Sequence, residues 1–150
     1  MSKAFSVKHN ASTRGALVTK LPSYCVTPWS FSSKEHETRE AAEDGAIYVI
    51  EVRRSKAIGT TYWLGYRFHS VARKKRPGGG KWDERFTYMN VSTPPVPAIG
   101  HYFPSPVRID DPTFHAWYVG VYGMAELSAE HRSLLDQMFT DPLLYAKPCA

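Results

Sequence analysis

Two histidines in similar settings are the first residues whose types can do chemistry. His69 lies in "YRFHS" and His115 lies in "TFHAWY". On neighbouring strands, two imidazoles can act as the base and the acid that cleave a phosphodiester, with Arg67 or Lys81 stabilising the developing charge. This is the chemistry of a metal-independent ribonuclease. Nothing in the spacing of the two histidines demands such a site, so this activity is our second alternative.

Carboxylates that can hold a divalent ion occur in two places. Glu43 and Asp44 are followed by Glu51 in "EDGAIYVIEVRR", which matches only loosely the carboxylate, spacer and lysine order of some nucleases. An acid pair fits the end of a helix equally well. A second group combines two acids with two histidines: His101, Asp110, Asp111 and His115. Because Asp-Asp-Pro is ordinary turn chemistry, we expect no metal site.

Sequence motifs for cofactor chemistry are absent. The chain has no C-x-x-C, H-E-x-x-H, Walker lysine motif or G-x-G-x-x-G. A nucleophilic role for Cys25 would need a partner base that the sequence does not identify. We therefore expect no cofactor, and a non-catalytic protein is favoured over an enzyme.

The two cysteines bear on the compartment. Two cysteines, Cys25 and Cys149, are too few for a disulfide framework, although the sequence allows one disulfide between them. Their small number is consistent with a reducing compartment. We expect an intracellular protein of the cytoplasm or nucleus.

The net charge of +5 conceals a strong segregation along the chain. Residues 1–34 carry five cations and no acid, and residues 35–52 carry one cation and six acids. Residues 53–85 carry ten cations and two acids, whereas residues 86–150 carry three cations and six acids. A basic segment of this kind attracts phosphate backbones, and the attraction depends on salt.

The stretch "VARKKRPGGGKWDER", residues 71–85, is the densest part of the basic segment. Proline and three glycines supply a turn between two predicted strands, so we expect a β-hairpin with a basic tip. The tip projects five cations: Arg73, Lys74, Lys75, Arg76 and Lys81. With Arg67 and Trp82 nearer the bases or the groove, these are the predicted nucleic-acid contacts.

Two apolar segments predict the centre of a sheet. "AIYVIEVRR", residues 46–54, has the apolar run of a strand that is buried on both faces. In "TYWLGYRFHSVAR" the alternation predicts a core side with Tyr62, Leu64, Tyr66 and Phe68. Trp63, Arg67 and His69 then share the opposite side.

The remaining segments complete the predicted fold. We expect a short polar helix near residues 33–43, begun by Ser32 and Glu35 as a capping box and ended by Gly45 in a left-handed turn. Residues 94–112, rich in proline, read as an extended loop or edge segment. Residues 114–123 predict a strand.

The last predicted element is an amphipathic helix that follows Ser128. Its apolar stripe contains Leu134, Leu135, Met138 and Phe139, and the stripe packs on the sheet. The fold class is therefore α+β: a single domain over residues 1–150 with a mainly antiparallel sheet of four to six strands. Residues 1–31 form a basic, acid-free arm. No apolar run approaches the length of a membrane span, so we expect no membrane partner.

The leading functional prediction is a small basic protein that binds nucleic acid without catalysis. It contacts phosphates through the hairpin of residues 71–85 and the N-terminal arm. An acidic protein surface is the other partner that such cations suit. The first alternative is accordingly a viral or mobile-element interaction protein, an inhibitor or a virion component, that binds a macromolecular partner.

Overall fold

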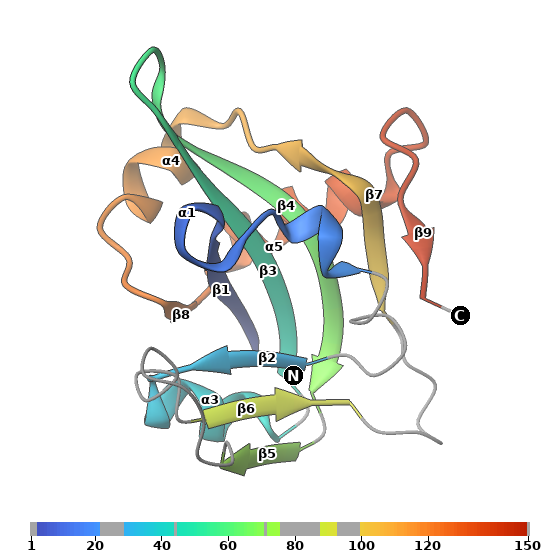
Figure 1. Cartoon of the computed structure of the whole chain (residues 1–150). Coiled ribbons are helices and arrows are strands. Elements are labelled where there is room, and N and C mark those ends of the chain that lie inside the picture. The colour runs from blue at the N-terminus through green and yellow to red at the C-terminus, as the bar shows by residue number, and fades with distance from the viewer. Residues whose placement is uncertain are drawn as a thin grey trace.

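The computed structural model describes residues 3–21, 29–43, 45–70, 72–75, 88–92 and 100–149. These residues form an α+β fold that is mainly strand (Figure 1). The strands are β1 (Ala4–Asn10), β2 (Trp29–Ser32), β3 (Gly45–Ser55), β4 (Gly59–Ser70), β5 (Ala72–Lys75), β6 (Tyr88–Val91), β7 (His101–Arg108), β8 (Met124–Glu126) and β9 (Lys147–Pro148). The helices are α1 (Ala11–Arg14), the 3-10 turn η1 (Leu17–Thr19), α3 (Glu35–Ala41), α4 (Pro112–Tyr118) and α5 (Ala129–Thr140).

Strand β3 lies inside the main sheet, as its apolar run predicted. The main sheet has six strands in the order β8-β1-β3-β4-β7-β9, and a second sheet has three in the order β2-β6-β5. Strand β3 pairs with β1 in parallel and with β4 antiparallel. Both of its faces are covered, because Ile47 and Val49 lie in one apolar cluster while Tyr48 and Ile50 lie in the other.

The two apolar clusters define two faces of the main sheet. On the α1 face, three residues pack against the sheet: Leu17 of η1, Leu21 two positions beyond η1, and Ala41 of α3. On the α5 face, helices α4 and α5 pack against the sheet through residues such as Phe114 and Leu135. The amphipathic C-terminal helix is thus confirmed, and Ser128 caps it by accepting a hydrogen bond from the His131 amide at 3.1 Å. Among the helices that the structure describes, none has the length and apolar character needed to span a membrane.

A β-bulge at Gly65 breaks the alternation expected along β4. The pairing with β3 shifts between Leu64, opposite Ile50, and Tyr66, opposite Val49. Leu64 therefore joins the cluster on the α5 face and Tyr66 joins the cluster on the α1 face. The prediction that one side carries all four apolar residues is wrong, although all four are buried. By the same shift, Trp63 lies on the face opposite Arg67.

The sequence predicts a basic arm over residues 1–31, but residues 4–10 form strand β1 instead. Strand β1 lies between β3 and β8, and Phe5 and Val7 are buried beneath the α1 face. The alternation of these apolar residues with Ser6 and Lys8 is the strand period of two. Residues 4–10 of the basic N-terminal segment are consequently part of the main sheet.

Residues 112–118 form helix α4 where we expected a strand. The Asp111 carboxylate accepts a hydrogen bond from the Phe114 amide at 2.8 Å, and Pro112 occupies the first turn. Both are helix-start signals. Phe114, Trp117 and Tyr118 then have the spacing of a helical stripe, which overrides the strand preference of aromatic residues.

The short polar helix is confirmed as α3, but its predicted ends are wrong. Lys34 precedes the first turn, and Ser32 belongs to β2 and accepts a hydrogen bond from the Lys34 amide at 3.0 Å. Gly45 begins β3 and does not close the helix in a left-handed turn. A side chain there would meet the Ala41 backbone at 2.7 Å, so the close approach of helix and strand requires glycine.

Part of the proline-rich segment forms β7 in the main sheet, while residues 93–99 lie outside the described residues. Pro104 and Pro106 lie in the stretch where the pairing with β4 is irregular, which suits residues without an amide hydrogen. The two-residue strand β9 pairs along the other side of β7. Cys149 follows β9, is buried and is disulfide-bonded, and Cys25 lies outside the described residues.

Candidate nucleic-acid interface

The base of the predicted hairpin at residues 71–85 is present. Strands β5 and β6 pair antiparallel, with Arg73 opposite Asn90, and they belong to the second sheet. Of Lys74 and Lys75 the structure describes the backbone. Three predicted contacts lie outside the described residues: Arg76, Lys81 and Trp82.

Arg73 does not project away from the body as predicted. Its Nη1 atom donates a hydrogen bond to the Glu35 carbonyl oxygen at 3.4 Å, and its guanidinium lies 4.8 Å from the centre of the Tyr88 ring. Helix α3, which carries Glu35, is held beside β6 by a hydrogen bond from the Asn90 amide to the Thr38 carbonyl at 2.9 Å. The packing of helix α3 on this sheet therefore gives Arg73 a hydrogen-bond partner within the protein.

Arg67 belongs to β4 of the main sheet, whereas Arg73 belongs to β5 of the second sheet. Arg67 turns under helix α5, where its Nη1 atom lies 2.6 Å from a carboxylate oxygen of Asp136, and its side chain is 20% exposed. The guanidinium also lies over the Phe139 ring, 4.5 Å from its centre. The bulge at Gly65 is the reason, because it turns Arg67 to the α5 face.

His69 and His115 do not meet. His69 lies opposite Ala46 near the end of β4, whereas the ring of His115, on helix α4, lies 5.2 Å from that of Tyr62 near the start of β4. His69 lies seven positions beyond Tyr62 along β4, a contour of about 23 Å. The two histidines line different cavities. A ribonuclease site that uses them as its base and acid is therefore not formed.

Three of the candidate metal ligands serve other purposes, and Asp44 lies outside the described residues. Glu51 is fully buried in the core, Asp110 lies 3.1 Å from the Arg108 guanidinium, and Asp111 caps α4. Within the described ranges, no group of three or more histidine, cysteine, aspartate or glutamate side chains is placed to hold a metal ion.

The sequence analysis missed a second basic hairpin, formed by β3 and β4. It contains Arg53, Arg54 and Lys56, and its loop projects beyond both sheets (Figure 1). Lys56 and Arg54 are exposed, and Ile58 near the turn is 64% exposed. The signal was the string "RRSKAIG", in which Gly59 adopts a positive φ of 80°. In the sequence, Arg53 and Arg54 fall at the end of a predicted strand, which gives no sign of a second basic hairpin.

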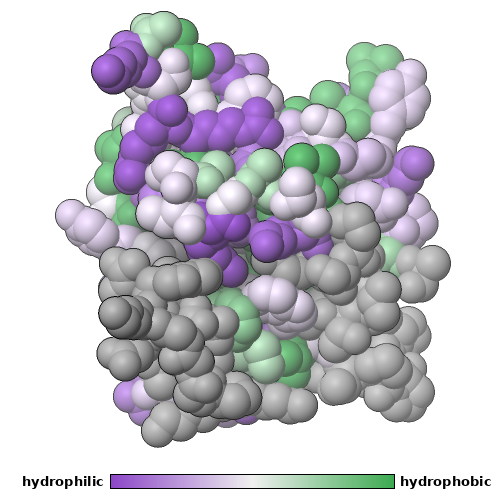
Figure 2. All heavy atoms as spheres, in the orientation of Figure 1, coloured by the Kyte–Doolittle hydropathy of each residue, from purple (hydrophilic) through white to green (hydrophobic). Residues whose placement is uncertain are grey.

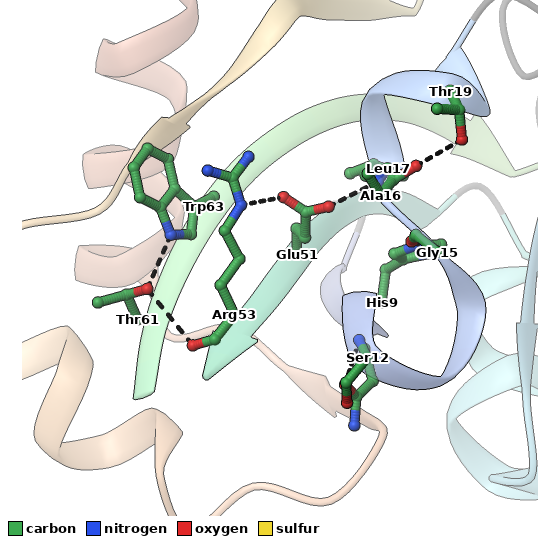
Figure 3. A network of polar contacts seen from close by, with 11 residues as sticks. His9, Ser12, Gly15, Ala16, Leu17, Thr19, Glu51, Arg53, Thr61 and Trp63 are labelled. Atoms are coloured by element: carbon green, nitrogen blue, oxygen red, sulfur yellow. Dashed lines mark hydrogen bonds and ion pairs between the residues drawn. The ribbon is translucent and has the colours of Figure 1, made fainter. Parts of the chain in front are cut away.

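A buried acid organises the base of the β3–β4 hairpin (Figure 3). The Glu51 carboxylate accepts hydrogen bonds from the Leu17 amide and from Nε of Arg53, both at 2.5 Å. The Arg53 guanidinium lies over the Trp63 ring, 4.0 Å from its centre, and the Trp63 indole donates to the Thr61 hydroxyl at 2.9 Å. The two terminal nitrogens of Arg53 point away from Glu51 (Figure 3). The side chain is thus fixed while part of the guanidinium stays exposed.

Two cations of the N-terminal segment, Arg14 and Lys20, lie near His9. Burial lowers the pKa of His9, and the nearby positive charges of Arg14 and Lys20 add to the effect. Figure 2 shows hydrophilic side chains over α1 and the neighbouring β3–β4 hairpin. This part of the molecule combines chargeable groups from two segments that are distant in sequence.

No protein-family model matches the chain, and no curated protein matches it as a relative. The chemistry of the site therefore has to be argued from its own groups. Exposed guanidinium and ammonium groups bind phosphate oxygens, and a guanidinium plane also stacks on unpaired bases.

Proposed function

We propose that the protein binds nucleic acid without catalysis and that the β3–β4 hairpin is its principal contact. The observation that carries the proposal is the separation of charge on this hairpin. Arg53, Arg54 and Lys56 reach its surface, while Glu51, the acid at its base, has no exposed area. The buried Glu51 carboxylate is bonded to Arg53 and only partly offsets the positive field of the three cations. An anion that approaches the hairpin is therefore attracted.

The hairpin also offers groups that contact bases. The Arg53 guanidinium rests on Trp63 and is held by Glu51, so its outer face is preorganised for stacking. Ile58 places an apolar side chain at the projecting turn, between the cations of β3 and the body of β4. Apolar residues in such positions enter between base steps in architectural proteins that bind DNA.

The cations of the hairpin at residues 71–85 would form a second, weaker contact. Arg73, Lys74, Lys75, Arg76 and Lys81 would add phosphate contacts at the end of the molecule that carries the second sheet. Arg73 is already engaged with α3, which favours the β3–β4 hairpin as the stronger site. We propose the cytoplasm or the nucleus as the compartment. In a reducing compartment the disulfide at Cys149 would be reduced to thiols.

Fluorescence anisotropy with labelled 20-nucleotide DNA and RNA tests the proposal. The hairpin variant, Arg54→Gln with Lys56→Gln, removes two exposed cations that make no described hydrogen bond or ion pair. The control variant, Arg39→Gln with Lys147→Gln, removes one exposed arginine and one exposed lysine elsewhere. We expect the wild type and the control variant to bind and the hairpin variant to bind more weakly. Failure of the wild type to bind either nucleic acid at 50 mM salt would contradict the proposal.

A protein-binding function is the second candidate, and exposed apolar residues near the C-terminus favour it. Leu143 and Tyr145 are 77% and 74% exposed, and Tyr145 holds a positive φ of 57°. An exposed aromatic residue in a costly backbone conformation suits a contact surface. Recovery of a stoichiometric protein partner after nuclease treatment, together with no binding to random oligonucleotides, would favour this function over nucleic-acid binding.

A further inference from the structure

A cavity lies between the β3–β4 hairpin and helix α4, which is next to the start of β4 below the projecting loop (Figure 1). Its volume is about 460 Å³, within the roughly 300–1,000 Å³ typical of pockets that hold small molecules. Three segments line it: the hairpin through Ile58, Thr60 and Tyr62, residues 108–110 at the end of β7, and α4 through His115 and Ala116.

Tyr62 is a buried residue of this cavity whose hydroxyl group has no partner among the described residues. The residue is 3% exposed, and its ring packs on the rings of Tyr118 and His115, with 4.8 and 5.2 Å between centres. No residue in the described ranges makes a hydrogen bond with the hydroxyl. Burial raises the pKa of Tyr62, so the hydroxyl keeps its proton. Because buried tyrosine hydroxyls normally have a hydrogen-bond partner, this one is available to a ligand in the cavity.

Two more polar side chains of the cavity are available in the same way. Within the part of the chain that the structure describes, the Thr60 hydroxyl and the His115 imidazole make no side-chain hydrogen bond. The Arg108 guanidinium lies 3.1 Å from the Asp110 carboxylate, so these two charges offset each other. Hydroxyl and imidazole groups can donate or accept. The cavity therefore suits an uncharged group that carries both donors and acceptors.

The rest of the lining is apolar or aromatic. Ile58, Ile109 and Ala116 supply apolar contacts, and the His115 ring supplies an aromatic one. A nucleobase has flat apolar faces and an edge with donors and acceptors. Proteins that bind single strands stack such bases on aromatic rings, including histidine, and form hydrogen bonds with their edges. A nucleobase therefore matches both kinds of lining.

A cation of the β3–β4 hairpin lies beside the cavity. Arg54 is directly opposite Thr60 in the pairing of β3 with β4, so the two side chains lie on the same face of the hairpin. The positive charge of Arg54 is close enough to Tyr62 to oppose the effect of burial on its pKa. A strand whose phosphate contacts Arg54 thus has a neighbouring base within reach of the cavity.

From this arrangement we infer that the cavity takes one unpaired base of the strand that the β3–β4 hairpin holds. The inference rests on the proposed function, since the hairpin supplies the phosphate contact. The base packs against Ile58 and His115, and its edge bonds to Thr60 and Tyr62. A base inside a duplex is stacked and paired, and it has to leave the stack before it can enter the cavity.

Fluorescence anisotropy with two probes of equal charge separates base binding from phosphate binding. One probe is a labelled single-stranded DNA of 20 nucleotides, and the other is an abasic strand of the same length, which keeps the phosphates and lacks the bases. We expect the wild type to bind the ordinary strand about tenfold more tightly than the abasic strand at 50 mM salt.

Tyr62→Phe removes the hydroxyl and keeps the ring that packs on Tyr118. We expect this variant to bind the ordinary strand about threefold to tenfold more weakly than the wild type does, and to bind the abasic strand equally well. Tyr122→Phe is the matched control, because it removes a tyrosine hydroxyl from a residue that is 83% exposed and lies outside the cavity lining. Its affinity for both probes should equal that of the wild type.

Ala116→Leu fills the cavity without removing a polar group. Ala116 is exposed on α4, so the substitution is compatible with the fold. We expect its affinity for the ordinary strand to fall to that for the abasic strand. Ala129→Leu makes the same change at an exposed position of α5 and should leave binding unchanged. Circular dichroism verifies that all four variants are folded.

The outcomes distinguish failure of this inference from failure of the proposed function. Equal affinity of the wild type for the ordinary and abasic strands overturns the inference and leaves the proposed function standing. Equal losses in Tyr62→Phe and Tyr122→Phe, or wild-type affinity in both Tyr62→Phe and Ala116→Leu, have the same meaning. Absence of binding to either probe contradicts the proposed function and the inference together.

Discussion

On the α1 face, the buried acid Glu51 positions Arg53, whose guanidinium is partly exposed at the surface. Glu51 is an acid that the sequence offers as a metal ligand, and the structure gives it two hydrogen bonds instead. One bond fixes η1 through the Leu17 amide, and the other fixes the Arg53 side chain at the hairpin. Sequence alone cannot distinguish these roles, because both require a carboxylate and the partner amide lies 34 positions away.

His9 makes the stability of the fold depend on pH. Its Nε2 atom lies 2.7 Å from the Gly15 carbonyl oxygen, so the neutral ring donates that hydrogen bond. Burial lowers its pKa below the value of about 6.5 expected in the unfolded chain. At a pH well above 6.5, His9 is neutral in both the folded and the unfolded chain. As the pH falls through 6.5, His9 is protonated in the unfolded chain first, so the free energy of unfolding decreases.

Urea denaturation between pH 7.5 and pH 5 measures this effect. We expect the free energy of unfolding to fall with pH in the wild type and to fall less steeply in His9→Gln. His101, whose pKa is also lowered by burial, contributes part of the slope that remains. Identical slopes in the two proteins would contradict the account of His9.

At the scale of elements, the bulge in β4 decides which side chains reach which face. A continuous apolar run predicted β3, an alternation predicted β4, and a helical stripe predicted α5. The faces of β4 were predicted wrongly, since a bulge shifts the alternation without changing the residue types. Helix α4 was missed because aromatic residues favour strands, while the Asp111 cap and Pro112 favoured the helix that formed.

Gly65→Ala tests the bulge directly. A Cβ atom at this position would lie 2.2 Å from Cδ2 of Leu17, so we expect a loss of about 1–3 kcal/mol in the free energy of unfolding. Leu17→Ala in the same chain removes the clash, and the double variant should lose less than the sum of the two single variants. Gly120→Ala is the matched control, since its nearest contact is 3.7 Å away. Strict additivity of Gly65→Ala and Leu17→Ala, measured by urea denaturation, would show that the two residues are not in contact.

At the scale of the whole molecule, the parallel pairing of β1 with β3 brings two basic segments together. Residues 3–21 carry four cations and no acid, and they pack beside the strand that leads to the β3–β4 hairpin. The acidic helix α3 contacts both sheets: Ala41 lies in the cluster on the α1 face, the Glu40 carboxylate pairs with Lys3, and the Asn90 side chain of β6 bonds to Thr38. The charge segregation is visible in the sequence, but its arrangement in space depends on contacts between distant segments that the sequence does not show.

The salt dependence of nucleic-acid binding tests the central proposal most directly. The logarithm of the association constant is measured against the logarithm of salt concentration for the wild type, the hairpin variant and the control variant. Each lost phosphate contact lowers the magnitude of the slope by about 0.9 on duplex DNA. We predict a decrease of about 1.8 for the hairpin variant and none for the control variant. An unchanged slope in the hairpin variant, or an equal decrease in both variants, would contradict the account.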